Sequence, residues 1–341
     1  MKIIDLRSDT VTKPTQEMLD AMMKAQVGDD VFGEDPTVNL LQEKAASLFG
    51  HEAGLFCPSG TMTNQIAIQV HTRPGDEVIC HENSHVYNYE GGGIARNALA
   101  TSRLVFSESP TMKASEIEPL IREEEDWLTH TSLIVAEDTS NRGGGKCYSF
   151  EDLHEISELA RAKNLAYHLD GARAFNAIIK ENHDIKDYGK LFDSISICLS
   201  KGLGAPVGSV LIGSKDFIKE ARRVRKVMGG GMRQAGLLAA AGIYGLENNI
   251  ERLREDHDNA EILADYLTDL REVTDVISPE TNIVIFDVNP EKGSKYYIEK
   301  LQAKGLRTVS FGKDRIRMVT HLEIGKREIQ QAGAILKEVL N

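Results

Sequence analysis

Short, uninterrupted apolar runs alternate with amphipathic helical patterns along most of this chain, and this rhythm constrains the fold most. The runs Ala53–Cys57, Ser194–Leu199 and Ser209–Gly213 are examples. A strand that is apolar on both of its faces must be covered on both, which is typical of a parallel sheet with helices on either side. The order of elements therefore predicts an α/β domain whose mostly parallel sheet is sandwiched by helices.

The rhythm changes near residue 246, and a compact α+β domain is expected to follow. We place the larger domain at 1–247 and the smaller one at 248–341. The strands expected in the larger domain are Ala53–Cys57, Glu77–Cys80, Arg103–Phe106, Leu133–Ala136, Leu165–Leu169, Ser194–Leu199 and Ser209–Gly213, with helices over 15–26, 36–49, 61–71 and from Ser149. The smaller domain is expected to hold helices over 250–270 and 293–304, the strands Ile283–Phe286, Arg307–Phe311 and Ile316–Val319, and a final helix.

The composition narrows the choice of partners. Lysine and arginine number 40 against 52 acidic residues, a formal charge of −12, so neither nucleic acid nor an anionic membrane is an expected partner. Cys57, Cys80, Cys147 and Cys198 have no paired spacing, and we expect buried free thiols in a reducing compartment. Charges near the N-terminus argue against a signal peptide, and no apolar run is long enough to span a membrane. A cytoplasmic location and no metal site are expected.

Ligands of an open α/β sheet bind beyond the carboxyl ends of its strands, and four features lie there. Lys201 leaves a buried strand into a turn that contains glycines, a place that suits Schiff-base chemistry; the alternative is a lysine that points to solvent. Asp170 ends another strand and could hold the protonated pyridine nitrogen of pyridoxal phosphate; the alternative is a helix N-cap.

The other two features are an anion cradle and a histidine. Gly60 and Thr61 lie between a strand and a helix, where backbone N–H groups and a hydroxyl suit a phosphate; an ordinary turn is the alternative. His85, with Tyr89 close behind, could stack on a cofactor ring or act as a base, or could be a surface histidine.

Basic residues in the second half of the chain suggest anion contacts. Arg317 lies in a strand-like segment, where an inward arginine suits a substrate carboxylate. The basic run around Lys226 is more often a solvated helix face, and Arg233 follows three glycines. Pyridoxal 5'-phosphate is indicated as the cofactor by four features that follow one another along the sequence. They are a phosphate cradle, a histidine that could stack on the ring, an acid for the pyridine nitrogen and a lysine for the Schiff base.

At this point the sequence resembles the low-specificity L-threonine aldolases, which have the aspartate aminotransferase type of fold. The resemblance extends from residue 5 to residue 321. It rests on the stretches Asp5-Leu-Arg-Ser-Asp-Thr-Val-Thr12, Val27-Gly-Asp-Asp-Val-Phe-Gly-Glu-Asp-Pro36, Pro58-Ser-Gly-Thr61, Leu169-Asp-Gly-Ala-Arg173, Cys198-Leu-Ser-Lys-Gly-Leu-Gly-Ala-Pro-Val-Gly-Ser209, Gly229-Gly-Gly-Met-Arg-Gln234 and Arg317-Met-Val-Thr-His321.

The resemblance implies a role for each matching residue. Lys201 would bind the cofactor covalently, Asp170 would pair with the pyridine nitrogen, and His85 would stack on the ring and help to transfer protons. Gly60 and Thr61 would bind phosphate, helped by Lys226 and Arg233 from a neighbouring subunit. Ser8, Arg173 and Arg317 would bind the substrate carboxylate, and Tyr89 would line the aldehyde side. The resemblance further implies a homotetramer, a dimer of dimers with its sites at subunit interfaces, that cleaves threonine-like β-hydroxy-α-amino acids to glycine and an aldehyde.

Two stretches depart from the family pattern. Many members have a histidine in the stretch before Thr131 that points at the substrate hydroxyl, but here only His130, next to the strand, is present. Many members read Glu-Asn-Thr-His-Asn where this chain has Glu137-Asp-Thr-Ser-Asn141. Both departures concern the base that takes the β-hydroxyl proton, for which His85 through water and a phosphate-held water are the candidates. Other reactions of the same cofactor, β-elimination or transamination, are the alternative function.

Overall fold

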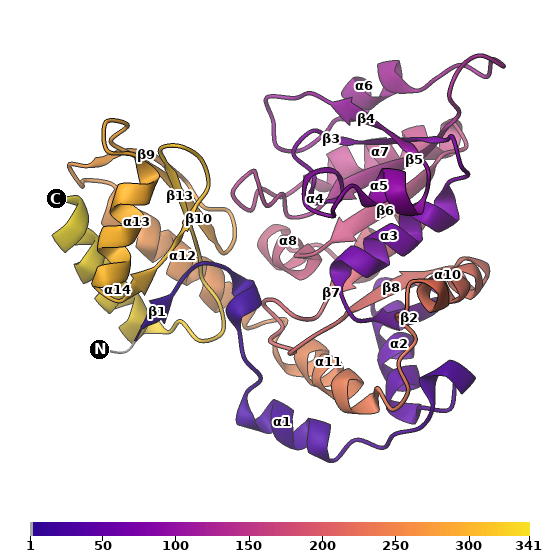
Figure 1. Ribbon diagram of the computed structural model, residues 1–341, viewed down its shortest axis with the longest axis horizontal. Coiled ribbons are helices and arrows are strands. Elements are labelled where there is room, and N and C mark those ends of the chain that lie inside the picture. The colour runs from indigo at the N-terminus through magenta and orange to yellow at the C-terminus, as the bar shows by residue number, and fades with distance from the viewer. Residues whose placement is uncertain (1–2) are drawn as a thin grey trace.

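The computed structural model describes residues 3–341 and has two lobes, which Figure 1 shows side by side. The larger lobe is built on a seven-stranded sheet of order β2-β8-β7-β6-β5-β3-β4. Its strands are β2 (Ala53–Cys57), β3 (Glu77–His81), β4 (Thr101–Val105), β5 (Thr131–Glu137), β6 (Ala166–Gly171), β7 (Ser194–Cys198) and β8 (Ser209–Gly213). Strand β8 runs opposite to the other six strands, which all point the same way, so the predicted mostly parallel sheet is confirmed.

Helices cover both faces of this sheet, as the apolar strands require. The strands send alternate side chains to opposite faces: Leu55 packs against one layer of helices and Phe56 against the other. One layer contains α3 (Gly60–His71), α4 (His85–Asn88), α5 (Gly93–Asn97) and α10 (Lys215–Val227). The other contains α2 (Pro36–Phe49), α7 (Phe150–Ala162), α8 (Ala174–Glu181), α9 (Ile185–Gly189) and α11 (Gly236–Asn248).

Shorter elements complete the larger lobe. They are α1 (Gln16–Met23), α6 (Ala114–Ile117) and the 3₁₀ turns η1 (Asp9–Val11), η2 (Asp30–Phe32) and η3 (Glu118–Leu120). The predicted helix starts at Asp35 and Ser149 are confirmed by their caps: Asp35 accepts from the N–H groups of Thr37 and Val38, and Ser149 from that of Asp152. Each cap satisfies N–H groups that the first helical turn leaves without a partner.

The smaller lobe is an antiparallel sheet covered by helices. The sheet has the order β12-β13-β10-β9. Its elements are β9 (Val273–Ile277), β10 (Ile283–Val288), β12 (Val309–Ser310) and β13 (Arg315–Val319), with α12 (Leu253–Leu267), α13 (Gly293–Ala303) and α14 (Lys326–Leu340). The N-terminal strand β1 (Ile4–Asp5) pairs here with β11 (Leu306–Arg307), and Ile4 and Leu6 join this lobe's core. The predicted boundary at 247/248 lies in the last turn of α11 and stays a prediction.

Two sequence-based expectations for the smaller lobe were wrong in detail. The single strand expected over Arg307–Phe311 is two short strands, β11 and β12, because the chain passes there from pairing with β1 to pairing with β13. Strand β9 was not expected. It lies at the edge of its sheet and is partly exposed along its length, so its sequence lacks the apolar pattern of a buried strand.

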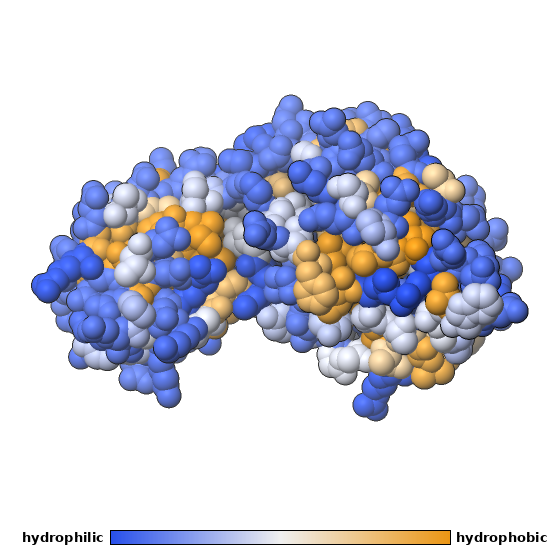
Figure 2. All heavy atoms as spheres, turned by 90° about the horizontal axis from the view of Figure 1, so that it is seen from above, coloured by the Kyte–Doolittle hydropathy of each residue, from blue (hydrophilic) through white to orange (hydrophobic). Residues whose placement is uncertain are grey.

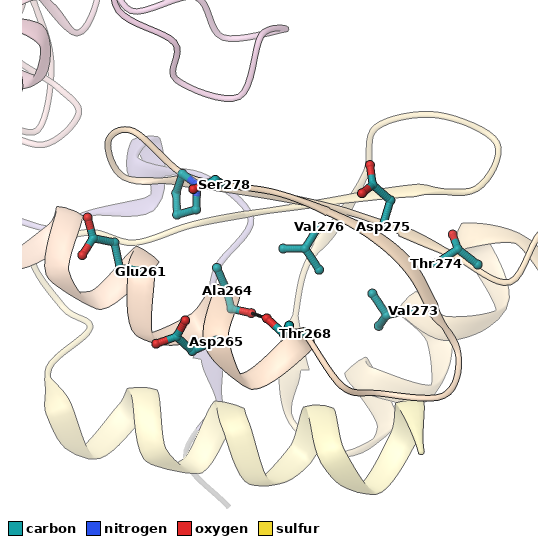
Figure 3. A pocket seen from close by; sticks show the side chains of 10 residues that line it. Glu261, Ala264, Asp265, Thr268, Val273, Thr274, Asp275, Val276 and Ser278 are labelled. Carbon is teal, nitrogen blue, oxygen red and sulfur yellow. Dashed lines mark hydrogen bonds between the residues drawn. The ribbon is translucent and has the colours of Figure 1, made fainter.

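A hollow in the smaller lobe lies between α12 and β9, and Figure 3 shows Glu261, Asp265 and Asp275 around it. None of the residues predicted to bind cofactor or substrate lines this hollow. Among the described residues no helix is long and apolar enough to cross a membrane.

Candidate active site

The predicted site residues follow the strands of the large sheet at one edge. Strands β3, β5, β6 and β7 are parallel, so their carboxyl ends meet there. Because β8 is antiparallel to both β2 and β7, the end of β2 and the start of β8 reach the same edge. The fold thus gathers the segments of His85, Asp170, Lys201 and Gly60, which are far apart in the sequence.

The backbone around Lys201 is fixed by hydrogen bonds on several sides. The Lys201 carbonyl accepts from the Gly204 N–H at 2.9 Å and from the Thr12 hydroxyl at 3.1 Å. Gly204 adopts a φ of 78°, a left-handed conformation that glycine tolerates best. The Lys201 side chain is therefore presented from a rigid, half-buried turn, as an amine that forms a covalent bond to a cofactor requires.

Asp170 has a buried carboxylate oxygen without a donor. The residue lies near the end of β6, is almost completely buried, and its Oδ2 has no hydrogen-bond partner among the described residues. Leaving such an oxygen unsatisfied costs about 1–3 kcal/mol. A protonated pyridine nitrogen would supply both the missing donor and a positive charge, so this residue fits pyridoxal phosphate.

An anion cradle lies at the start of α3. Ser59 caps the helix by accepting from the Met62 N–H at 3.2 Å. The buried hydroxyl of Ser209, at the start of β8, has no partner among the described residues. It lies 3.4 Å from where a Cβ on Gly60 would stand. The space left by Gly60, the free hydroxyl of Ser209 and the helix N-terminus with Thr61 fit a phosphate group.

His85 lies among carboxylates at the start of α4. Its backbone N–H donates to Glu137 Oε2 at 2.6 Å, and its ring Nδ1 lies 2.9 Å from Glu90 Oε1. A ring nitrogen of His85 and one oxygen each of Glu90 and Asp170 lie within 4.8 Å of one another. Burial alone would lower the pKa of His85, but the bond to Glu90 and the charges of Asp170, Glu90 and Glu137 raise it.

Tyr89 lies beside the His85 ring, with centroids 5.7 Å apart, and is about half exposed. The predicted grouping of His85, Asp170 and Tyr89 thus occurs in the structure. Glu137 is buried near Asp170, and its pKa is raised by burial and by the Asp170 charge.

Arg173 forms a buried ion pair that the sequence did not indicate. Its Nε and Nη2 donate to the two oxygens of Asp9, each at 2.8 Å. Burial alone would raise the pKa of Asp9, but the charge and hydrogen bonds of Arg173, with the charge of Lys201, hold it well below its usual range. Two of the guanidinium nitrogens of Arg173 are therefore committed to Asp9, and Ser8, which precedes Asp9, caps η1 by accepting from the Thr10 N–H.

Arg317 has a partly buried guanidinium whose hydrogen-bond acceptors in the structure are neutral. It donates from Nη1 to Asn141 Oδ1 at 2.7 Å and from Nη2 to the Arg7 carbonyl at 3.2 Å. Its Nε has no partner among the described residues, and its guanidinium lies 4.8 Å from the Phe311 ring centroid. Burial, then the charge of Arg173, lowers its pKa to about 10. A partly buried cation with an unused donor fits a carboxylate ligand.

Two predicted residues lie in other surroundings within the chain. Lys226, on α10, lines a hollow with Val31, Arg222 and Arg225. Arg233 donates to Asp29 at 2.9 Å. These surroundings do not include Lys201, Asp170 or His85, and the roles expected for Lys226 and Arg233 stay predictions.

Four residues of the site were missed from the sequence: Asp9, Glu90, Glu137 and Ser209. Asp9 and Ser209 lie within stretches that carry the family pattern, and Glu137 begins a stretch that departs from it, but no spacing rule gave any of them a partner. Glu90 lies five positions after His85 and before three glycines, a signal that could have been noticed. His130 is half exposed and pairs with Glu124 at 3.0 Å.

The fold and this edge of the sheet define the class of protein: an α/β enzyme with a lysine, an unpartnered aspartate and a phosphate cradle suited to pyridoxal phosphate. The profile of the beta-eliminating lyase family, whose members depend on this cofactor, matches residues 5–291. The low specificity L-threonine aldolase of Escherichia coli (strain K12) is 42% identical over 333 residues, covering 97% of this chain and 98% of that one. Low-specificity L-threonine aldolase 1 of Arabidopsis thaliana is 42% identical, covering 100% and 97%.

The chain therefore belongs to the beta-eliminating lyase family and, within it, to the low-specificity L-threonine aldolases. Solved structures support the fold. A threonine aldolase of Leishmania major matches with a TM-score of 0.83 at 21% identity, covering 99% of each chain. A putative L-allo-threonine aldolase of Listeria monocytogenes matches with a TM-score of 0.80 at 22% identity, covering 98% and 96%.

The buried ion pair between Asp9 and Arg173 is expected to stabilise the folded protein. Asp9→Asn removes the charge that compensates Arg173 and should lower the free energy of unfolding by about 3 kcal/mol. Because the pKa of Asp9 is lowered by folding, the difference should be full at neutral pH and should shrink as the pH falls below about 4.

Urea unfolding of the two proteins at several pH values measures this difference. Asp5→Asn is the matched control, because it removes a carboxylate paired with the exposed Arg7 and should cost under about 1 kcal/mol. Equal losses in the two variants would contradict the importance of the Asp9–Arg173 pair.

Proposed function

We propose that this chain cleaves the Cα–Cβ bond of L-threonine, L-allo-threonine and related β-hydroxy-α-amino acids, giving glycine and an aldehyde. The observation that carries the proposal is the combination of an unpartnered buried oxygen on Asp170 with Lys201 at the same sheet edge and an unused donor on Arg317. The curated relatives that share about two fifths of their residues over nearly the whole chain are named for the same reaction.

Bound pyridoxal phosphate supplies an electron-poor ring that accepts the electron pair of the breaking bond. Lys201 provides the amine that holds the cofactor, and Asp170 keeps a positive charge at the ring nitrogen. The Gly60–Thr61 turn and Ser209 bind the phosphate. These residues together fix the ring in one place.

Arg317 positions the substrate. Its unused donor would bind the carboxylate of the amino acid and so fix the orientation of the bond to be broken. Ser8 and the remaining nitrogen of Arg173 complete the carboxylate site, and Tyr89 lines the side from which the aldehyde leaves. His85 acting through water, or a water bound by the phosphate, takes the proton of the β-hydroxyl.

The proposal extends to assembly and location. We propose a homotetramer made of two dimers, in which Lys226 and Arg233 reach a neighbouring subunit's phosphate. In support, Met23, Phe32 and Val227 are more than 70% exposed although apolar, and Figure 2 shows apolar surface on the upward face of the molecule. Four buried free cysteines support a reducing, cytoplasmic location. Release of glycine supports a role in glycine biosynthesis.

The products test the function directly. Purified protein with pyridoxal phosphate should convert L-threonine, L-allo-threonine and β-phenylserine to glycine and the corresponding aldehyde. Lys201→Ala should lose both this activity and the visible absorbance of covalently bound cofactor. Ammonia and a keto acid as the main products would instead support β-elimination, and a Lys201→Ala protein that keeps colour and activity would refute the assignment of the lysine.

The role of Arg317 can be tested separately, through the KM for the amino acid. Arg317→Ala should raise the KM for the amino acid on the order of 10²-fold, because a charged hydrogen bond to the carboxylate is lost, while the affinity for cofactor changes little. Arg315→Ala is the matched control from the same strand: Arg315 pairs with Asp287 at 2.7 Å, and its loss should leave KM unchanged. Equal loss of substrate and cofactor affinity in Arg317→Ala would contradict the assignment.

A further inference from the structure

A continuous series of hydrogen-bonded polar side chains, buried except for the partly buried His71, leads from the end of α3 to the ring of His85. Its members come from α3, β6, β7 and the segment between α4 and α5, and none of them contacts a substrate or cofactor in the function proposed above. In order, they are His71, Ser194, His168, Asn64 and Glu90. Burying polar side chains costs free energy unless each of them has a hydrogen-bond partner. This hydrogen-bonded series therefore needs a physical explanation.

Glu90 is the member that touches His85, and it is surrounded by donors. Its side chain is completely buried. Oε1 accepts from Asn64 Nδ2 at 2.9 Å and lies 2.9 Å from His85 Nδ1, while Oε2 accepts from Gln65 Nε2 at 2.5 Å. A carboxylic acid would need an acceptor for its own proton, whereas the two amide nitrogens of Asn64 and Gln65 both donate. This is the environment of a carboxylate.

Gly93, three positions after Glu90, makes room for this arrangement. A Cβ on Gly93 would stand 2.3 Å from Cδ of Gln65, so any other residue there would push Gln65 away from Glu90. Gly93 thus keeps one of the donors of Glu90 in place.

Glu90 and His168, on either side of Asn64, fix the orientation of its amide. Since a carboxylate only accepts, Asn64 must turn its amide nitrogen to Glu90 and its oxygen to His168 Nε2, 3.2 Å away. Burial lowers the pKa of His168 to about 3, so the ring is neutral and must carry its proton on Nε2 to donate to Asn64.

The same proton fixes the rest of the hydrogen-bonded series. His168 Nδ1 then accepts from the Ser194 hydroxyl at 2.8 Å, and that hydroxyl accepts from His71 Nε2, also at 2.8 Å. Nδ1 also lies 3.1 Å from the Ser194 carbonyl oxygen, but only the Nε2-protonated ring gives Asn64 Oδ1 a donor. Every hydrogen bond from His71 to Glu90 is then donated in the direction of Glu90.

The direction of these hydrogen bonds leaves Glu90 as an acceptor for the His85 ring. A ring that donates from Nδ1 to Glu90 has, in its neutral form, a bare Nε2 that can take a proton. We propose that Glu90 is a positioning residue that fixes His85 with its proton on Nδ1 and so makes Nε2 the base for the β-hydroxyl, with Asn64, Gln65 and His168 holding Glu90 in place. This inference rests on the proposed function and selects His85 over a phosphate-bound water.

The charges around His85 determine the pH dependence. The carboxylates of Glu90, of Glu137 from β5 and of Asp170 from β6 face it, and together they raise its pKa in spite of its burial. The rate should fall on the acid side as Nε2 becomes protonated. Removing the Glu90 charge should lower the pKa of His85 and move this acid limb to lower pH.

Glu90→Gln tests the proposal in the full-length protein with cofactor. The acid limb of kcat should move to lower pH by about one unit, and kcat on its plateau should fall on the order of 10²-fold. KM and the absorbance of bound cofactor should change little. A purely structural role for Glu90 would not move the pH profile, so an unchanged acid limb would overturn the proposal.

A second variant controls for folding. Glu90→Gln combined with Gln65→Glu keeps one carboxylate and one amide in the same buried cluster but moves the charge to the side away from His85. It should restore the free energy of unfolding more than it restores kcat. Recovery of full activity with an unshifted acid limb would contradict a requirement for the carboxylate at position 90.

A third readout needs no activity. In ¹⁵N-labelled wild-type protein without cofactor, nuclear magnetic resonance should show the neutral His85 ring protonated on Nδ1, with His85→Asn assigning the signal. A proton on Nε2 would refute the proposal even if threonine is cleaved. A proton on Nδ1 in a protein that releases no glycine would leave the positioning role intact and refute the proposed function instead.

Discussion

The candidate active site of this protein depends on one buried carboxylate, that of Asp170. Asp170 is fixed near the end of β6 with an oxygen that no described residue satisfies, although Glu137, a second carboxylate, lies beside it. Two neighbouring acids in a buried place are stable only when positive charge or donors compensate them. Lys201, His85 and the phosphate cradle lie at the same edge of the sheet, and a cationic ring bound there would supply that compensation.

The N-terminal segment connects the two lobes at this site. Leu6 belongs to the core of the smaller lobe, and its carbonyl accepts from the Val319 N–H of β13 at 2.8 Å. Three residues later, Asp9 pairs with Arg173 of the larger lobe. The Arg7 carbonyl between them accepts from Arg317. A short stretch of chain thereby places the arginine of the smaller lobe against the site of the larger one.

The sequence predicted the features that follow from local patterns. Apolar strands predicted the covered parallel sheet, and residues directly after strands predicted Lys201, Asp170, Gly60 and His85. It could not predict that Asp9 forms an ion pair with Arg173, or that Asn64 binds Glu90 and His168 binds Asn64. Those contacts join segments far apart in the chain. The strand expected over Arg307–Phe311 was wrong for a similar reason: which sheet each residue joins is decided by β1, from the other end of the chain.

The claim that Asp170 keeps a positive charge on the ring nitrogen has a direct test. Asp170→Asn should fold and bind pyridoxal phosphate but lose most of its activity, because a neutral amide does not favour a protonated ring. Cofactor methylated on that nitrogen carries the charge permanently and should restore a measurable part of the activity to Asp170→Asn. An Asp170→Asn protein that is as active as the unchanged chain with ordinary cofactor would contradict the account.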